Sequence, residues 1–376
     1  MSATARRAVA AVRPTATAVG RVSRARASSG GGGPGGLLGS LLCPVAAVAA
    51  GLVASMPEQR RQGPSWEAAD WRKPQEGFLD VYRLEQQRIL GSGLSGTVCV
   101  AVDVRSGKQW AVKSVAKSAE AQEEVKTHWM VSDHPNIVAL REVFEDGGRY
   151  HMVMQLERGG ELYEHLTAAD SVMEEGQKLQ VLREIAEAVA HLHSLGIVHH
   201  DIKPENILLT GRVGTGEGAI SKLGDFGSSF RLAAGGGRLH PGPKEYTAVY
   251  SAPEVVSGED CGGAPADAKA ADVWALGVLA VILFQGHHPF DPKGMADEEE
   301  IVANIIHAEP ELAGPVWDGL PPAAVALIGC MLAKDPASRP SAREVLDSPW
   351  LANVFPSRQN ASPSPCPSGC TCPQGS

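Results

Sequence analysis

The chain has 376 residues, of which 20% are charged, and a formal net charge of -9 at pH 7. Its length allows one large or two-lobed domain of roughly 250–300 residues together with tails. The acidic balance argues against nucleic acid as the main partner, because phosphate contacts need clustered Lys and Arg. Only 5% of the residues are aromatic, which leaves few platforms on which single-stranded bases could stack.

The seven cysteines do not form the pattern of a secreted disulfide framework. Four of them stand far apart, and Cys366, Cys370 and Cys372 share the last residues with no histidine or acid among them. Structural zinc normally takes four ligands, so a flexible tail is favoured over a metal site. Cysteines scattered in this way are typical of a protein in a reducing compartment.

The first residues differ in composition from the rest of the chain. No acidic residue precedes Glu58, whereas six arginines stand among Ala, Ser and Thr within residues 1–36. This composition is typical of a transit peptide, and we expect a chloroplast address, with a mitochondrial one as second choice. A disordered basic leader is the alternative. Fluorescent fusions at the C-terminus, with and without residues 1–56, distinguish these compartments.

Residues 37–56 are hydrophobic, and the 18 residues 37–54 carry no charge. As a helix they would span about 27 Å, just under the ~30 Å hydrocarbon core of a bilayer. Pro44 and several Gly and Ala residues weaken this segment, so it is either a membrane anchor or the hydrophobic end of the targeting peptide. An anchored protein in the cytoplasm is therefore a further alternative.

Residues 57–79 are polar and predict a linker, and residues 354–376, rich in Pro, Ser and Cys, predict a disordered tail. The folded domain is expected between them, at 80–353. Its first part, 82–115, has the alternating apolar positions of strands. Residues 178–195 have one apolar helical face, and 273–284 are apolar nearly all round, as in a buried helix. The predicted class is α+β, with a small β-rich N-terminal lobe and a larger α-helical C-terminal lobe.

A glycine-rich run lies between the first predicted strands. Three glycines have the spacing G-x-G-x-x-G-x-V, and such glycines let backbone N–H groups approach phosphate oxygens. A dinucleotide-binding fold would need a helix directly afterwards, whereas 97–102 continue as a strand, which disfavours a dehydrogenase. The candidate nucleotide-binding residues of this run are Leu90, Gly91, Ser92, Gly93, Leu94, Ser95, Gly96, Thr97 and Val98.

Lys113 lies on the next predicted strand, 17 residues after Gly96. A lysine that points inward beneath a glycine hairpin can reach the α- and β-phosphates of a nucleotide. It needs a carboxylate to orient it, and Glu123 and Glu124 are both available on the following helical stretch, with Glu124 favoured. A solvated ion pair of little energetic value is the alternative.

The most specific pattern is the run 199–206, followed 19 residues later by Asp225 in an Asp-Phe-Gly sequence. Asp201 can accept a hydrogen bond from a substrate hydroxyl, and Lys203 can neutralise a γ-phosphate. Asn206 and Asp225 can supply oxygen ligands from two different loops. Such a pair suits Mg²⁺, which keeps waters and bridges substrate phosphates.

Taken in order, these motifs resemble those of eukaryotic-type protein kinases over about 270 residues. The similarity continues in the runs Ala252–Glu254, Asp272–Gly277 and Asp335–Pro340. It implies a bilobal protein-kinase-like fold with ATP and Mg²⁺ in the cleft, and Arg339 as the partner of the Glu254 carboxylate. The resemblance implies catalytic roles for Asp201, Lys203, Lys113, Glu124 and Thr247, ATP binding by Lys113, Ala111, Met154 and Glu161 with the glycine run, and metal binding by Asn206 and Asp225.

Lys203 and Thr247 resemble the serine/threonine branch of this family. The runs Gly159–Leu162 and His134–Val138, with Pro349–Leu351, are similar to the calcium/calmodulin-dependent kinase group. In that group acidic residues such as Glu161 and Glu205 often face basic residues upstream of the phosphorylated site, so a preference for Arg is a hypothesis, with plain surface carboxylates as the alternative. No EF-hand loop occurs, and the tail after Leu351 has no basic amphipathic helix for calmodulin, so built-in calcium control is not expected.

Two features depart from the family pattern. His200 stands where the family usually has an Arg that docks a phosphorylated activation loop, and a mostly neutral histidine cannot reproduce that bidentate grip. We therefore expect weak dependence on activation-loop phosphorylation. The loop at 233–243 is also unusually rich in Gly. A pseudokinase-type nucleotide-binding scaffold is the alternative function, although Lys113, Asp201 and Asp225 are all present; a small-molecule kinase is disfavoured by the complete 247–254 region.

Overall fold

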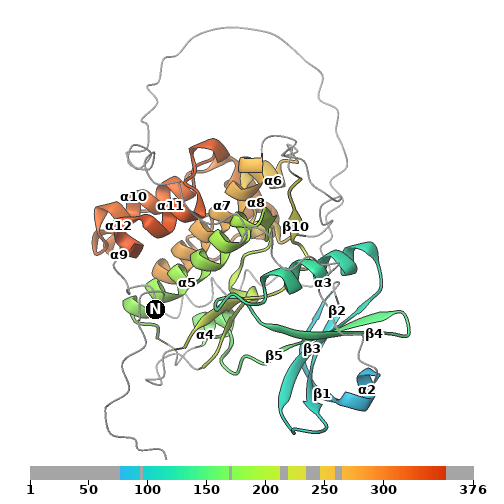
Figure 1. The fold of residues 1–376 in the computed structure, drawn as a ribbon. Coiled ribbons are helices and arrows are strands. Elements are labelled where there is room, and N and C mark those ends of the chain that lie inside the picture. The colour runs from blue at the N-terminus through green and yellow to red at the C-terminus, as the bar shows by residue number, and fades with distance from the viewer. Residues whose placement is uncertain are drawn as a thin grey trace, which may run out of the picture.

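The computed structural model of the chain describes residues 77–93, 96–168, 172–211, 219–233, 246–258 and 265–352. The expected leader, hydrophobic segment and tail lie outside these residues. A sheet-based lobe is followed along the chain by a larger helical lobe (Figure 1). This is the α+β arrangement that the sequence predicted.

The N-terminal lobe is built on one antiparallel sheet with the strand order β1-β2-β3-β5-β4. A short helix, α2 (Phe78–Val81), leads into the sheet, and α3 (Ala119–Val131) crosses it. Ser118 caps the N-terminus of α3, and its hydroxyl accepts a hydrogen bond from the Ala121 N–H. The strands are β1 (Tyr82–Gly93), β2 (Gly96–Asp103), β3 (Gln109–Ala116), β4 (Leu140–Asp146) and β5 (Arg149–Gln155).

Side chains alternate across the strands, so each face of the sheet carries its own apolar cluster. On one face, α3 packs on residues of β3, β4 and β5, including Val115, Val143 and Met152. On the other face, Phe78 and Tyr82 cover residues of β2, β3, β4 and β5, including Trp110. Helices α3 and α2 lie on different sides of the sheet in Figure 1.

The C-terminal lobe is helical and contains the largest apolar cluster of the described residues. Long helices α5 and α7 pack against each other, with shorter helices around them (Figure 1). The helices are α4 (Leu162–Thr167), α5 (Glu175–Ser194), α6 (Pro253–Val256), α7 (Pro265–Gln285), α8 (Glu298–His307), α9 (Pro315–Asp318), α10 (Pro322–Met331), α11 (Ala342–Asp347) and α12 (Pro349–Ala352), with 3₁₀ turns η3 (Pro204–Asn206), η4 (Ala248–Tyr250) and η5 (Pro336–Ser338).

Helix α7 forms the centre of this lobe. Its Trp274 is fully buried and stacks on Phe290 with ring centroids 5.5 Å apart. A Cβ at Gly277 would lie 2.9 Å from Leu332 Cδ2 and 3.1 Å from Met331 Cβ, so the glycine lets the end of α10 pack closely on α7. Among the described residues, the window Ala268–Gln285 is long and apolar enough to cross a membrane, but 89% of it is buried inside the protein. It is therefore a core helix.

Short strands carry the loops at the junction of the lobes. Strands β6 (Gly160–Glu161), β8 (Ile207–Leu209) and β9 (Ser221–Leu223) form one sheet, and β7 (Ile197–Val198) pairs with β10 (Phe230–Arg231). The chain from β7 to β8 contains Asp201 to Asn206. The Val138 N–H donates to the Leu223 carbonyl at 3.0 Å, which ties the end of β9 to the segment after α3. This bond positions Asp225 below the N-terminal lobe.

Arg339 forms the ion pair with Glu254 that the sequence predicted. Its guanidinium donates to both carboxylate oxygens at 2.7 Å, and its side chain has no exposed surface. It also donates to the carbonyls of Ala333, Ala270 and Lys334. One buried cation therefore joins helix α6, helix α7 and the chain before α11.

We predict that Arg339→Ala lowers the free energy of unfolding by about 3–5 kcal/mol, because it leaves a buried carboxylate and three carbonyls without their donor. The control is Arg343→Ala, which removes an exposed pair with Asp347 (side chains 76% and 59% exposed) and should change stability by about 0.5 kcal/mol or less. Chemical denaturation of the two variants measures both effects. Equal losses would contradict the assignment of Arg339 as a buried tie.

Candidate active site

The glycine hairpin is formed by the end of β1 and the start of β2. Gly91 pairs with Val98 and Ser92 with Thr97. Gly96 has a φ of +126°, and a Cβ there would lie 2.8 Å from Val115 Cγ1 and 2.9 Å from the Ser114 carbonyl. No other residue fits this position without displacing β3. At Gly91 the corresponding space is open, and Leu94 and Ser95 lie outside the described residues.

Lys113 joins the two lobes. Its Nζ lies 2.6 Å from Glu124 Oε1 on α3 and 2.8 Å from Asp225 Oδ1 in the other lobe. Glu123, the weaker candidate, pairs with Lys126 instead at 2.7 Å. The structure thus brings together Lys113, Glu124 and Asp225.

The charges in this cluster shift one another's pKa values. The side chains of Lys113 and Glu124 are each only 7% exposed. Burial alone would lower the pKa of Lys113, but the two carboxylates outweigh it and raise the pKa well above its usual value. Burial would likewise raise the pKa of Asp225, but the Lys113 charge lowers it to about 2. Lys113 is therefore an ammonium ion and Asp225 a carboxylate at neutral pH.

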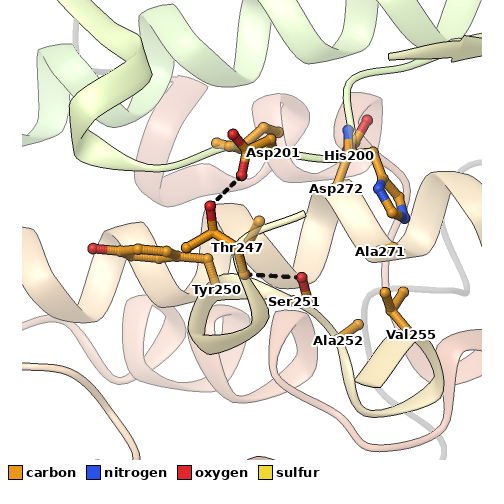
Figure 2. Close-up of a pocket in the computed structure, with 11 residues that line it drawn as sticks. His200, Asp201, Thr247, Tyr250, Ser251, Ala252, Val255, Ala271 and Asp272 are labelled. Carbon is orange, nitrogen blue, oxygen red and sulfur yellow. Dashed lines mark hydrogen bonds between the residues drawn. The ribbon is translucent and has the colours of Figure 1, made fainter. Parts of the chain in front are cut away.

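Asp201 is the centre of a second hydrogen-bonded group. Thr247 Oγ1 donates to Asp201 Oδ1 at 2.7 Å, as Figure 2 shows, and Lys203 Nζ lies 2.7 Å from Asp201 Oδ2. Lys203 also donates to Thr247 Oγ1 at 2.6 Å. Asn206 Nδ2 donates to Asp201 Oδ2 at 2.9 Å and to the Asp201 carbonyl at 2.8 Å. Three residues from two loops far apart in the sequence therefore hold one carboxylate in a single orientation.

Asn206 connects the two groups. The Gly224 N–H donates to the Asn206 carbonyl at 2.9 Å, and Gly224 precedes Asp225. Asp225 has a left-handed backbone, with φ +56°, which a non-glycine residue rarely adopts and which is frequent at functional sites. The two predicted metal-binding residues are thus held by adjacent backbone segments.

The donor set fits Mg²⁺. Both side-chain hydrogen bonds of Asn206 use Nδ2, so its Oδ1 remains for a ligand, and Asp225 supplies a carboxylate. Two oxygens from the protein suit Mg²⁺, which completes its octahedron with waters and substrate phosphates. Among the described residues, no group of three or more His, Cys, Asp or Glu is placed to hold a metal. The site fits a metal that arrives with a nucleotide rather than one in an all-protein cage.

Asp272 supports the loop that carries Asp201. It is 1% exposed and accepts hydrogen bonds from the backbone N–H groups of His199 and His200 at 2.9 and 2.8 Å. Its Oδ2 also lies 2.9 Å from His193 Nε2. Helix α7 thereby fixes the backbone just before Asp201.

The other predicted ATP-binding residues lie on neighbouring strands. Ala111 on β3 pairs directly with Met154 on β5, and Val98 pairs with Lys113. Glu161 lies at the start of the C-terminal lobe, on β6. The glycine hairpin, Ala111 and Met154 therefore share one sheet, and Lys113 lies among them.

Sequence reasoning missed His128, one helical turn after Glu124. Its ring is 1% exposed and stacks on Phe226 with centroids 4.7 Å apart, while His199 contacts Phe226 edge-on at 5.2 Å. Burial lowers the pKa of His128 to about 4, so the neutral ring donates through Nε2 to the Val138 carbonyl at 2.7 Å. The i, i+4 spacing from Glu124 was the available signal.

His200 also has a left-handed backbone, with φ +68°. Its ring lies edge-on to Phe230 at 5.5 Å and to Tyr246 at 5.8 Å. It lines a pocket together with Thr247, Ala252 and Asp272 (Figure 2). An imidazole in aromatic contact offers no fork of donors for a phosphate.

The fold has two lobes, and one lysine forms ion pairs with a carboxylate of each lobe, next to a hydrogen-bonded Asp and Asn. This combination defines the class of protein kinases. The protein kinase domain model matches residues 84–351. The chain therefore belongs to the protein kinase family, as the sequence predicted.

The similar proteins are kinases by name, and one of them, PKZ1, is named a serine/threonine-protein kinase. The chain is 34% identical over 278 residues to ribosomal protein S6 kinase alpha-2 of Homo sapiens, covering 73% of this chain and 36% of that protein. It is 34% identical to serine/threonine-protein kinase PKZ1 of Phytophthora infestans, covering 70% and 69%, and 32% identical to MAP kinase-activated protein kinase 2 of Mus musculus, covering 73% and 69%. It thus spans about a third of the first of these relatives.

The twitchin kinase region from C. elegans is a similar solved structure. It aligns with a TM-score of 0.60 and 28% identity, over 74% of this chain and 47% of that chain. The predicted protein-kinase fold is confirmed.

Because His200 lacks a donor fork, we predict that phosphatase treatment changes the rate of phosphate transfer by less than about twofold, in contrast to the larger effect of ordering a loop through Arg–phosphate bonds. The measurement compares treated and untreated enzyme, with complete dephosphorylation checked by mass spectrometry. His200→Arg is the matched variant and should gain a dependence on phosphorylation. A large loss of activity in the treated wild-type enzyme would contradict the prediction.

Proposed function

We propose that this protein is a serine/threonine protein kinase that transfers the γ-phosphate of ATP to hydroxyl groups of protein substrates, with Mg²⁺ as cofactor. The observation that supports it most strongly is the convergence of Lys113, Asp225, Asn206 and Asp201 through hydrogen bonds or adjacent backbone. Phosphoryl transfer needs positioning and charge stabilisation more than covalent chemistry, and these residues supply both. No observation favours a pseudokinase.

The residues would act as follows. Asp201, oriented by Thr247 and Asn206, would accept the hydrogen bond of the substrate hydroxyl and take its proton. Lys203, 2.7 Å from the same carboxylate, would stabilise charge on the transferred phosphoryl group. Lys113 would bind the α- and β-phosphates beneath the glycine hairpin. Asn206 Oδ1 and Asp225 would hold Mg²⁺, which neutralises charge that develops between the phosphates.

Replacing the central carboxylate tests this proposal. We expect Asp201→Ala to lower kcat by about 10²–10⁴, the usual contribution of a general base, while affinity for nucleotide stays within a few-fold. Radiolabelled ATP with purified protein measures transfer, and Asp347→Ala, a change at an exposed side chain (59%), is the control. Nucleotide binding without transfer by the wild-type chain would favour the scaffold instead.

We further propose that the substrates carry a basic residue upstream of the phosphorylated hydroxyl. Both carboxylate oxygens of Glu205 are buried, and neither is hydrogen-bonded to another residue that the structure describes. Burial raises the pKa of Glu205 to about 7; Lys203 opposes this rise, and the charges of Asp201 and Glu161 add to it. A buried carboxylate that no other residue pairs with is costly, and a guanidinium would satisfy both of its oxygens.

This arrangement predicts a pH dependence of substrate binding. Glu205 is protonated below about pH 7 and ionised above it, and an Arg side chain binds the ionised form. The KM for an Arg-containing peptide should therefore fall several-fold between pH 6 and pH 8. The same peptide with Ala for Arg is the control, since titration of ATP affects both peptides equally.

The variant Glu205→Gln should remove the difference between the two peptides at every pH. If the wild-type enzyme treats both peptides alike across this range, then Glu205 is an ordinary carboxylate and the proposed preference is wrong.

A further inference from the structure

The segment 77–82, here called the strap, precedes the residues that the protein kinase domain matches, 84–351. It comprises Gly77, helix α2 and Tyr82 at the start of β1. Phe78 is 2% exposed and Tyr82 is 0% exposed, whereas Leu79 between them is 73% exposed. The strap therefore has one strongly buried side although it lies outside the shared family domain.

The strap covers the face of the sheet that α3 leaves open. Phe78 lies edge-on to Phe144 at 5.5 Å and stacks on Tyr82 at 5.8 Å. These rings belong to one cluster with Trp110, Val112 and other strand residues. Because large apolar patches are rare on monomeric proteins, this face requires a cover, and the strap supplies it from the same chain.

A polar chain continues from Phe78 into the sheet. The His151 ring on β5 lies parallel to Phe78, with centroids 4.3 Å apart and 5° between the planes. Its Nδ1 lies 2.8 Å from Ser114 Oγ on β3, and its Nε2 lies 3.0 Å from Asp146 Oδ1 on β4. His151 and Ser114 are also direct partners across the β5–β3 pair. The ring that Phe78 covers thus ties three strands together.

This connection ends next to the phosphate-handling residues. Ser114 follows Lys113, whose side chain points to the opposite face of β3 and reaches Glu124 and Asp225. The strap also anchors β1, because the Tyr82 hydroxyl donates to Glu142 and Tyr82 pairs with Asp103. The glycine hairpin is the other end of that strand.

We propose that Phe78 is a positioning residue for nucleotide binding: by stacking on His151 it holds the Ser114 end of β3, and so places Lys113 for the phosphates of ATP. The inference rests on the proposed function, since it names a further residue that acts on the same site. It also assigns the docked strap a role in nucleotide binding that the shared domain 84–351 alone would lack.

Two point variants in the full-length chain test this role. We expect Phe78→Ala to raise the KM for ATP about 3- to 10-fold, the range of coupling through packed side chains, with kcat changed less than about twofold. Leu79→Ala, on the exposed side of α2, should leave both constants unchanged. Assays are run well below the melting temperature of each variant. A Phe78→Ala protein with a lower melting temperature but wild-type KM would overturn the proposal.

A second variant avoids loss of the aromatic packing. His151→Phe keeps a ring against Phe78 but removes the bonds to Ser114 and Asp146, so it should raise the KM for ATP as Phe78→Ala does. Phe78→Ala should then add little in the His151→Phe background, because coupled residues are not additive. Fully additive effects, or a wild-type KM in His151→Phe, would overturn the route through His151.

A binding measurement separates this inference from the proposed activity. Coupling between two sites is reciprocal, so bound ATP should slow hydrogen exchange in residues 77–82. Phe78→Ala should raise the Kd for a fluorescent ATP analogue by the same 3- to 10-fold. If the wild-type chain shows these effects but transfers no phosphate, the proposed function fails and the positioning role stands. If it transfers phosphate while the strap exchanges equally with and without ATP, only the positioning role fails.

Discussion

The buried ammonium of Lys113 is the interaction on which the arrangement of the site depends. An isolated charge in the interior costs several kcal/mol to desolvate, and Lys113 is 7% exposed. Two carboxylates offset this cost, one on helix α3 and one in the other lobe, at 2.6 and 2.8 Å. If either carboxylate moved away, the buried cation would lose part of its compensating charge. The two carboxylates therefore hold helix α3 and the loop of Asp225 against the same strand.

A second constraint acts within the helical lobe. Asp272 accepts hydrogen bonds from two backbone N–H groups just before Asp201. Asp201 in turn accepts hydrogen bonds from Thr247 and Asn206. Buried acceptors that are fully satisfied are rigid. The orientation of Asp201 is therefore set by helix α7 below it and by the Thr247 loop beside it, before any substrate binds.

Between these two groups lies an aromatic contact that involves no charge. Phe226 is enclosed by His128 and His199, and each imidazole donates to a backbone carbonyl near the Asp225 segment. The neutral state of His128 follows from its burial. Helix α3 is thus joined to Phe226 by packing, and to Asp225 through the charge of Lys113. The position of a helix in one lobe is therefore linked to the position of a loop in the other.

The sequence by itself determined the family of this protein and the candidate residues for its chemistry. The spacing of the glycines, Lys113, the Asp201 to Asn206 run and Asp225 predicted the fold class, which the structure confirms, and the candidate phosphate- and metal-binding groups, because these requirements are local and depend on residue type. It also predicted the pairing of Arg339 with Glu254, through the family resemblance. Only the tertiary structure decided which side chains meet across the core. Helical phase turns Glu124 toward Lys113 and Glu123 toward Lys126, His128 reaches Phe226 nearly 100 residues later in the chain, and Phe78, inside a stretch that reads as a polar linker, is buried against His151. These contacts depend on burial and long-range packing, which no short pattern in the chain records.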